Sequence, residues 1–484
     1  MSEMVAPATG VAMVADREAP ARYRFGPLER RGLIAGWRSG QLATVAAGLL
    51  VAVGVLRVMP TVPGVLVAVL AVGAAAAAAT VPLAGRTAEQ WAPDALRHGV
   101  RHVARWQAAR RPGPFASLHV AAVTTGDGRD EAGVVIDLMA GTYTAVIEAC
   151  APGFVLLGHH DRDRRVADWA AVLASLAAEA GAAHRLQWVE RAFPDGAGSL
   201  RRYVARHRVA GAGTAVGDSY DELLALAGLS SLRHETLLAL TVSARRAGRA
   251  VRAGGGGHAG GCAVVLRQVA ALRRRLADIG ITTSAPLGPA AVAAAMRRAT
   301  LPAAEAALAS ASARWPWPMA YDAGWAQLRA DATWHAVYWV AEWPRTEVGA
   351  DFLCPLLLLP DVRRTVAVVM EPIAPAVAAR QVEQARTADL ADAELRRRGG
   401  FLATARRRRE EEVLARREAE LADGHAQIRF SGYVAVTADT PEALADACGR
   451  VEQAAAHAGL ELRRCFGDQL EAFACSLPLG RGLG

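Results

Sequence analysis

Two long apolar runs near the N-terminus are the strongest hydrophobic pattern in the chain. The runs Gln41–Leu56 and Val58–Gly85 carry no charged side chain, and Pro60 and Pro63 mark a turn between them. At 1.5 Å per residue the second run is long enough for the ~30 Å hydrocarbon core of a bilayer, and the first is slightly short. The pattern predicts a transmembrane helical hairpin over residues 41–85, with these residues inside it: Gln41, Leu56, Pro63 and Leu83.

A buried hairpin of a soluble protein is the alternative interpretation. A signal peptide is disfavoured for the first run, because 40 residues precede it and a second apolar run follows directly. Arginines flank the hairpin on both outer sides, whereas the turn carries only Arg57 at its edge: Arg22, Arg24, Arg30, Arg31 and Arg38 come before it, and Arg86, Arg97, Arg101, Arg105, Arg110 and Arg111 after it. The positive-inside rule therefore predicts a multi-pass protein of the plasma (inner) membrane with both termini cytoplasmic. Residues 1–40 would be a cytoplasmic segment and residues 86–114 a juxtamembrane linker.

Beyond the linker, alternating strand and helix patterns predict an α+β fold in two lobes. In the first lobe, residues 115–330, four segments have the composition and alternation of strands: 118–124, 134–138, 143–149 and 184–192. Helical spacing covers residues 165–181 and 264–279, and the glycine-rich residues 253–261 read as a loop.

The second lobe, residues 331–484, repeats this alternation. Strands are expected at residues 333–344 and 365–373, with a helix at 348–359 between them. Two long charged helices, 375–398 and 401–423, would form a helical hairpin broken at Gly399-Gly400. A β-α-β unit over residues 428–438, 441–459 and 460–466 completes the lobe.

Composition excludes one class of motor protein. The formal net charge is +8, and every cationic residue other than histidine is arginine, since the sequence contains no lysine. A Walker A loop needs lysine to reach the β- and γ-phosphates, so the tail glycines Gly480, Gly482 and Gly484 are not a P-loop. The six cysteines form no C-x-x-C pair, which argues against a zinc site or a disulfide framework. We therefore expect no enzyme activity, no cofactor and no metal.

Short motifs that suggest chemistry are incomplete. The stretch Gly158–Arg165 places His159, His160, Asp161 and Asp163 together, but a turn and helix cap is favoured over a metal site because no second cluster completes the shell. The run Gly211–Gly217 departs from the spacing of a dinucleotide-binding loop. A hydrolase that uses His159, His160 and Asp161, and a membrane-bound coupling protein that binds nucleic acid through its arginines, remain alternative functions.

Six tryptophans crowd residues 314–344, among them Trp315, Trp317 and Trp325. A core around one strand and a partner surface are equally good interpretations, since tryptophan is common at the energetic centre of interfaces.

With both lobes laid out, the soluble part resembles the N-terminal, non-motor half of the TraC-class ATPases of type IV secretion (conjugation) systems. The segments that carry the resemblance include DRRVADWAAVLASL, LQWVERAFP, RHETLLALTV, WHAVYWVAEWPRTEVGADFLCPLL, RTVAVVMEPIAPAVAARQVEQA and QLEAFACSLPLG. The start, YRFGPLERRGLIAGWRSGQ with the hairpin, is similar to a PrgI-like two-span membrane subunit, and the combination resembles a family of actinobacterial membrane proteins.

This resemblance implies a membrane-anchored scaffold of a conjugation or secretion machine that docks a separate P-loop ATPase. In such ATPases a Leu-Pro segment like Leu477-Pro478 leads into the motor domain, so Leu477, Leu479 and Arg481 would form part of the docking surface. The alternative is that residues 470–478 pack into the second lobe. Other membrane subunits and membrane lipid are further expected partners. Self-association, nucleic-acid binding and the nature of the cargo, DNA or protein, stay open.

Overall fold

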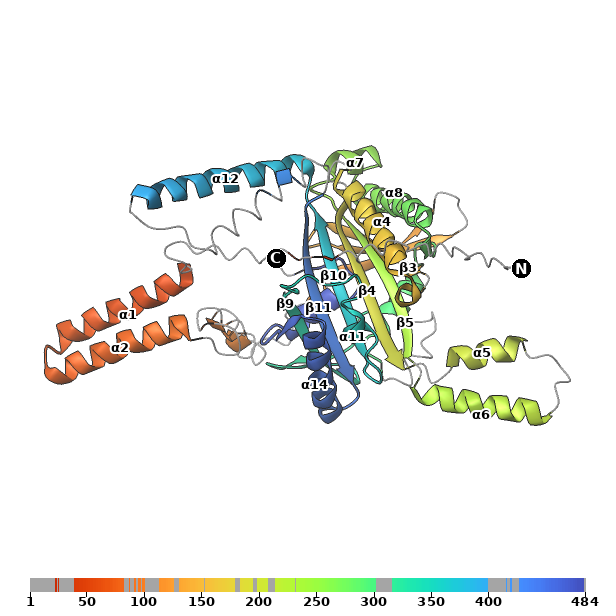
Figure 1. Cartoon of the computed structure of the whole chain (residues 1–484), viewed down its shortest axis with the longest axis horizontal. Helices are drawn as coiled ribbons and strands as arrows, with labels where there is room; N and C mark the ends of the chain where they lie inside the picture. Colours follow the sequence, from red (N-terminus) through yellow and green to blue (C-terminus); the bar gives the residue numbers. More distant parts are fainter. Residues whose placement is uncertain are drawn as a thin grey trace, which may run out of the picture.

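The computed structural model describes residues 22–23, 25, 39–81, 87, 91–92, 95–96, 98–100, 113–125, 130–151, 153–178, 183–194, 198–207, 214–230, 232–301, 316–398, 415, 418–419 and 426–482. Within these residues, a hairpin of two apolar helices precedes a mixed α+β domain built on one large antiparallel sheet (Figure 1). The predicted fold class is confirmed at this level.

The chain first forms the apolar hairpin and then the first half of the α+β domain. The hairpin consists of α1 (Ser39–Val58) and α2 (Val62–Thr80). The elements of the first half are β1 (Leu118–Thr124), β2 (Glu131–Asp137), β3 (Thr142–Cys150), η1 (Phe154–Leu156), α4 (His159–Ala178), β4 (Ala183–Pro194), α5 (Gly198–His207), α6 (Thr214–Ser230), β5 (Leu232–Ser243), α7 (Gly248–Ala253), α8 (Gly257–Asp278), β6 (Thr282–Thr283) and α9 (Pro289–Arg297).

The second half has the same succession of strands. Its elements are β7 (Tyr321–Ala323), β8 (Leu328–Ala330), β9 (Thr333–Glu342), α11 (Cys354–Leu357), β10 (Arg364–Pro372), α12 (Pro375–Arg398), β11 (Ile428–Ala438), α14 (Pro441–His457), β12 (Glu461–Arg464) and α15 (Gln469–Ser476).

The two halves of the sheet repeat the same arrangement of strands. Its strand order is β1-β2-β3-β5-β4-β10-β11-β9-β8-β7, and adding six to each number in the first five strands gives the second five in reverse. β6 pairs with β3, and β12 pairs with β9 in the same way. The antiparallel pairing of β4 with β10 joins the two halves at the centre. The two predicted lobes therefore share one continuous sheet.

The C-terminal ends of α8 and α14, which correspond in the repeat, have the same local backbone geometry. Gly280 follows α8 with φ 74°, and Gly459 follows α14 with φ 72°. In both places the next residue donates its backbone N–H back into the helix, from Ile281 to the Leu276 carbonyl at 2.8 Å and from Leu460 to the Ala455 carbonyl at 2.9 Å. Glycine suits these positions because a side chain disfavours the left-handed conformation that ends such a helix.

Helices cover both faces of the sheet, so the central strands are buried on both sides. On one face α4 and α8 pack on the first half and α14 on the second. On the other face lie α9 and α15. Successive residues of β5 alternate between these layers, with Leu238 and Leu240 towards α8 and Leu237 and Ala239 towards the opposite layer. Burial on both faces explains why these strands are continuous apolar runs.

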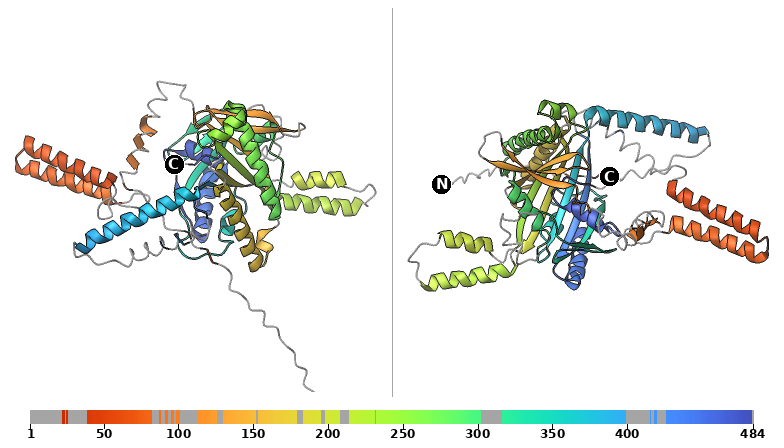
Figure 2. Two further views of the ribbon diagram at one scale, coloured as in Figure 1. Left: turned by 90° about the horizontal axis from the view of Figure 1, so that it is seen from above. Right: turned by 180° about the vertical axis from the view of Figure 1, so that it is seen from behind.

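The repeat also places a helical arm at the same connection in each half. α5 and α6 connect β4 to β5, and α12 begins the connection from β10 to β11. Arg386 of α12 donates to Glu418 at 2.7 Å, which agrees with the predicted helical hairpin over residues 375–423, although most of its second helix lies outside the described residues. The α5–α6 arm lies on the opposite side of the sheet from α1 and α2 in all views (Figure 2).

Three predicted elements differ from the structure for local reasons. The predicted glycine-rich loop over residues 253–261 shortens to Gly254–Gly256, because α7 ends at Ala253 and α8 already begins at Gly257. A Cβ on Gly260 would overlap the Val251 carbonyl, and one on Gly261 the Tyr143 ring, so these glycines allow close packing. The predicted helix over 348–359 shortens to Cys354–Leu357, since Pro355 favours a helix start and Pro360 cannot continue one. The predicted start of α4 is six residues too late.

Candidate functional site

The apolar hairpin is held together by close packing and one polar contact. Gly48 of α1 lies so close to Ala75 of α2 that a Cβ would overlap its side chain, and small residues of this kind let membrane helices approach each other. Gln41 donates from Nε2 to the Ala79 carbonyl at 2.8 Å, which satisfies its amide at the open end of the hairpin. Pro63 lies in the first turn of α2, where its missing N–H costs nothing.

The outer surface of the hairpin is apolar. Both helices are long and apolar enough to cross a membrane, and large side chains such as Leu50 and Leu70 are more than 70% exposed. Leu56 is also exposed, whereas Leu83 lies outside the described residues. Apolar surface of this extent needs a nonaqueous environment, so the hairpin is a candidate membrane anchor.

A short segment before the hairpin is attached to the second half of the domain. Phe25 packs its ring against Trp343 at 5.3 Å and Phe352 at 5.2 Å between centroids. Tyr23 pairs with Val348 through two backbone hydrogen bonds, and its hydroxyl donates to Asp163 at 3.0 Å. Burial, together with this carboxylate, raises the pKa of Tyr23 to about 12.

A second aromatic contact attaches the segment that follows the hairpin. Trp91 stacks on Trp325 with ring centroids 5.6 Å apart and contacts Phe466 at 5.3 Å. His98 meets the edge of Trp325 at 5.2 Å. The chain is thus tied to the second half of the domain on both sides of the hairpin, which fixes how the anchor connects to the sheet.

The predicted tryptophan surface separates into different environments. Trp317 is buried, stacks on Phe115 with centroids 5.8 Å apart, and belongs to the core. Trp325 is partly exposed and contacts this chain's own juxtamembrane segment. Trp315 lies outside the described residues. Sequence reasoning missed Trp91 and Phe25 because nothing in their local pattern indicates partners hundreds of residues away.

The end of the described chain lies in the core. Leu477 and Leu479 are each 3% exposed or less, so they are not available as a docking surface. Gln187 of β4 links the segment to the sheet, since its amide donates to the Cys475 carbonyl at 2.8 Å and accepts from the Gly480 N–H at 2.7 Å. Gly480 has φ 63°, and a Cβ there would overlap Thr241, so glycine is required at this turn.

Arg481 extends this attachment to β2, a further strand of the first half of the domain. Its guanidinium donates to Asp137 Oδ2 at 2.6 Å and to the Pro114 carbonyl at 2.7 Å. Burial alone would raise the pKa of Asp137, but the hydrogen bonds from Arg481 and the Ala140 N–H outweigh it and lower the pKa. Arg481 therefore forms a half-buried intramolecular ion pair.

Two further carboxylates sit among arginines inside the domain. Glu235 of β5 accepts from Arg298 at 2.7 Å and lies 3.6 Å from Arg191, which is itself buried. Glu371 of β10 accepts from Arg246 at 2.8 Å. These arrangements compensate buried charge and offer no nucleophile or general base with a free path to a substrate.

The candidate metal-binding and dinucleotide-binding motifs lie at the starts of helices. His159, His160, Asp161 and Asp163 lie in the first turns of α4. Among the described residues, no three or more His, Cys, Asp or Glu side chains are placed so that they could hold a metal ion together. Of the run Gly211–Gly217, only the last four residues are described, and they begin α6. His234 Nδ1 and Glu190 Oε1 form a hydrogen bond at 2.9 Å.

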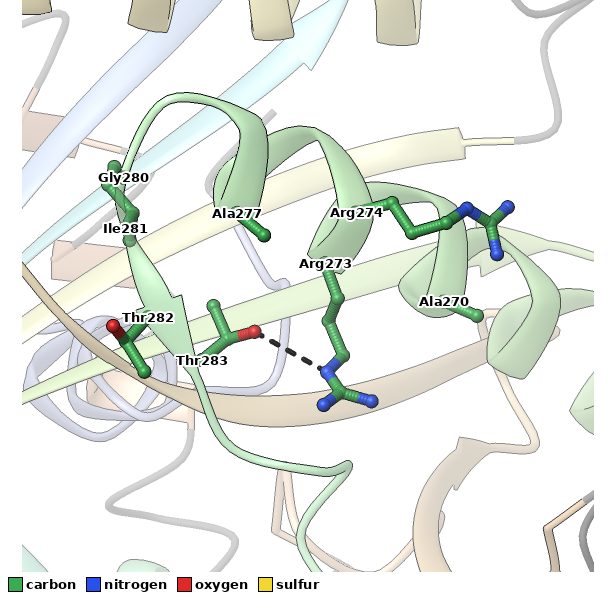
Figure 3. A pocket seen from close by; sticks show the side chains of 8 residues that line it. All are labelled: Ala270, Arg273, Arg274, Ala277, Gly280, Ile281, Thr282 and Thr283. Atoms are coloured by element: carbon green, nitrogen blue, oxygen red, sulfur yellow. Dashed lines mark hydrogen bonds between the residues drawn. The ribbon is translucent and has the colours of Figure 1, made fainter.

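A hollow of about 510 Å³ lies between α8 and β6 (Figure 3). Arg273 and Arg274 come from α8, and Arg273 donates from Nε to Thr283 Oγ1 at 3.4 Å. Its lining contains no carboxylate, histidine or cysteine, so we assign it no catalytic role.

Comparison with known families gives one match. Residues 231–340 match the family model described as "Putative type VII ESX secretion system translocon, EccE". The matched stretch runs from β5 through α7, α8, α9 and the strands β6 to β8 into β9, and it covers less than a quarter of the chain. A comparison with curated proteins finds no match.

This match corrects the resemblance to type IV secretion. The matched residues contain RHETLLALTV and the start of WHAVYWVAEWP, two of the segments on which the TraC-class resemblance depended. Those segments are buried strands, whose apolar composition follows from burial and is shared by many unrelated sheets. The type IV, conjugation and TraC-class assignments are therefore wrong, whereas a membrane component of a secretion machine agrees with the match and with the two candidate spans.

Proposed function

We propose that this chain is a membrane-anchored structural subunit of a type VII ESX secretion translocon. The match of residues 231–340 to the EccE family carries the proposal. The apolar hairpin supports membrane anchoring, and the aromatic contacts of Phe25 and Trp91 support mechanical coupling of the anchor to the domain. The subunit supplies no ATP hydrolysis, because the chain has no lysine for a Walker A loop.

The partners in this proposal are other subunits of the same secretion machine. The α5–α6 arm offers them a surface, since Val216, Tyr220, Leu223 and Leu226 of α6 are all exposed. Their spacing of three and four residues places them on one side of the helix. Aligned apolar side chains of this kind on a projecting arm are typical of protein contacts. The corresponding α12 arm of the second half is richer in charge, so the two arms would serve different purposes.

The proposal predicts a defined effect of altering the α6 surface. In the native host, tagged full-length chain should co-purify with type VII ESX subunits from membranes dissolved in mild detergent. Replacing Leu223 and Leu226 by serine should reduce that recovery about thirtyfold, which corresponds to two anchor side chains at about 1 kcal/mol each. The measurement is quantitative mass spectrometry of the co-purified proteins.

A matched control uses exposed apolar residues away from the arm. Leu156→Ser together with Leu358→Ser likewise replaces two exposed leucines and should leave recovery unchanged. If no type VII subunit is recovered with the parent chain, the proposed function is wrong. If the control and the arm variant behave alike, the arm is not the contact.

A further inference from the structure

Six arginines gather at the end of the sheet where β5 and β10 finish and β4 and β11 begin. We call them the α7 arginine patch: Arg185, Arg245, Arg246, Arg249, Arg252 and Arg429. Three of them surround Glu371, with Arg429 at 2.5 Å, Arg246 at 2.8 Å and Arg185 at 3.9 Å. Burial would raise the pKa of Glu371, but the hydrogen bond and charge of Arg429 outweigh it and lower the pKa.

The charge of the patch is far from balanced. Glu371 is one carboxylate among six guanidinium groups. His184, 3.5 Å from Glu371, is neutral near pH 7, because burial and the charges of Arg185 and Arg246 lower its pKa to about 4. Within the described part of the chain, no carboxylate pairs with Arg245, Arg249 or Arg252, and all three are exposed. The patch therefore presents several uncompensated positive charges to its surroundings.

The packing of α7 directs these charges outward. Ala247 and Val251 are buried against the core, so the apolar side of this short helix faces inward. No large apolar or aromatic side chain of Gly248–Ala253 is exposed. The exposed side chains of α7 are those of Arg249, Arg252 and the small Ala253.

This composition distinguishes between classes of anionic partner. Protein interfaces draw most of their affinity from buried aromatic and aliphatic anchors, and proteins that bind single-stranded nucleic acid draw theirs from bases stacked on aromatic side chains. α7 offers neither anchors nor aromatic side chains. An anionic membrane surface needs neither of them to attract arginines. The candidate spans already hold the chain at a bilayer.

We propose that the α7 arginine patch binds the phosphate headgroups of anionic lipids and holds this end of the sheet against the membrane. The contact would orient the domain relative to the bilayer in addition to the attachments at Phe25 and Trp91. It depends on insertion of the hairpin and not on which secretion machine the chain serves.

The test uses the full chain reconstituted in vesicles of phosphatidylcholine alone or mixed with phosphatidylglycerol. Hydrogen exchange of the backbone amides of residues 244–256 should be slower with phosphatidylglycerol, and high salt should abolish the difference. Each arginine near an anionic surface changes binding about fivefold, so Arg245→Ser, Arg249→Ser and Arg252→Ser combined should weaken docking about a hundredfold. Exchange of the variant in phosphatidylcholine should match the parent, which shows that α7 still folds.

The control variant, Arg267→Ser with Arg274→Ser, removes two exposed arginines of α8 and should keep the protection by phosphatidylglycerol. Equal exchange in the two lipids would overturn the proposal. So would protection by polyglutamate or by RNA in phosphatidylcholine vesicles without protection by phosphatidylglycerol, because the patch would then serve a protein or nucleic acid.

Discussion

Replacing Leu477 and Leu479 by alanine should destabilise the domain by about 4 to 10 kcal/mol, since each buried Leu→Ala change costs about 2 to 5 kcal/mol. Both side chains are almost fully buried, with Leu470 and Phe473 in the same cluster. The loss is comparable to the whole stability of a typical domain, about 5 to 15 kcal/mol. We expect the double variant to be unfolded or degraded at growth temperature, and each single variant to unfold at clearly lower urea concentration.

Leu156→Ala is the matched control, because that leucine is 92% exposed and its truncation should change stability by less than about 0.5 kcal/mol. Urea unfolding of the full chain in detergent, followed by far-ultraviolet circular dichroism, gives the comparison. A double variant as stable as the control would show that residues 477–479 are surface, as expected of a docking segment.

Lowering the pH from 7 to 5 should already destabilise the domain, although carboxylates titrate only at lower pH. Burial, with the charge of Arg363, lowers the pKa of His335 from 6.5 to about 3, and the pKa of His184 falls to about 4. Below pH 6.5 the unfolded chain binds protons that the folded chain excludes, so stability falls as the pH falls. Between pH 7 and pH 5 each histidine should cost about 2 kcal/mol. Asp137 and Glu371, whose pKa values are lowered, lose their contribution only in more acidic solution, below their unfolded values near 4.

His335→Asn isolates this effect. The imidazole lies between the hydroxyls of Thr333 at 2.9 Å and Thr437 at 3.0 Å, so the variant should be less stable at pH 7 by about 1 to 3 kcal/mol. Its further loss between pH 7 and pH 5 should be about 2 kcal/mol smaller than that of the parent. His457→Asn, at an exposed position on α14, should leave the profile unchanged. A parent profile that is flat from pH 7 to pH 5 would contradict the buried neutral state of His335.

Elements with strong local patterns were predicted from sequence alone. The strands at residues 118–124 and 428–438 and the helix at 375–398 have the predicted bounds, because alternation and helical spacing are local properties. β5 and the alanine-rich α9 and α15 were missed. A short apolar run does not tell a strand from a buried helix, and these elements are defined by the layers that cover them.

The candidate site was harder to predict than the secondary structure, because it is built from contacts between residues that are distant in the sequence. The pairing of β4 with β10, the stacking of Trp91 on Trp325 and the link from Gln187 to Gly480 join residues far apart in sequence, which no local pattern indicates. Leu477 and Leu479 illustrate the limit, since an apolar residue near a chain end has the same sequence signature in a core and at an interface. The hairpin was predictable because a bilayer sets its length and polarity.

Secretion by the native host is the most direct test of the central claim, that this chain is a working subunit of a type VII translocon. A strain with the gene deleted should lose its type VII substrates from the culture medium while retaining them in the cell, as measured by quantitative mass spectrometry of both fractions. The full chain supplied in trans should restore export, and Leu156→Ala should restore it equally. Unchanged export in the deletion strain, with the other type VII subunits intact, would contradict the account.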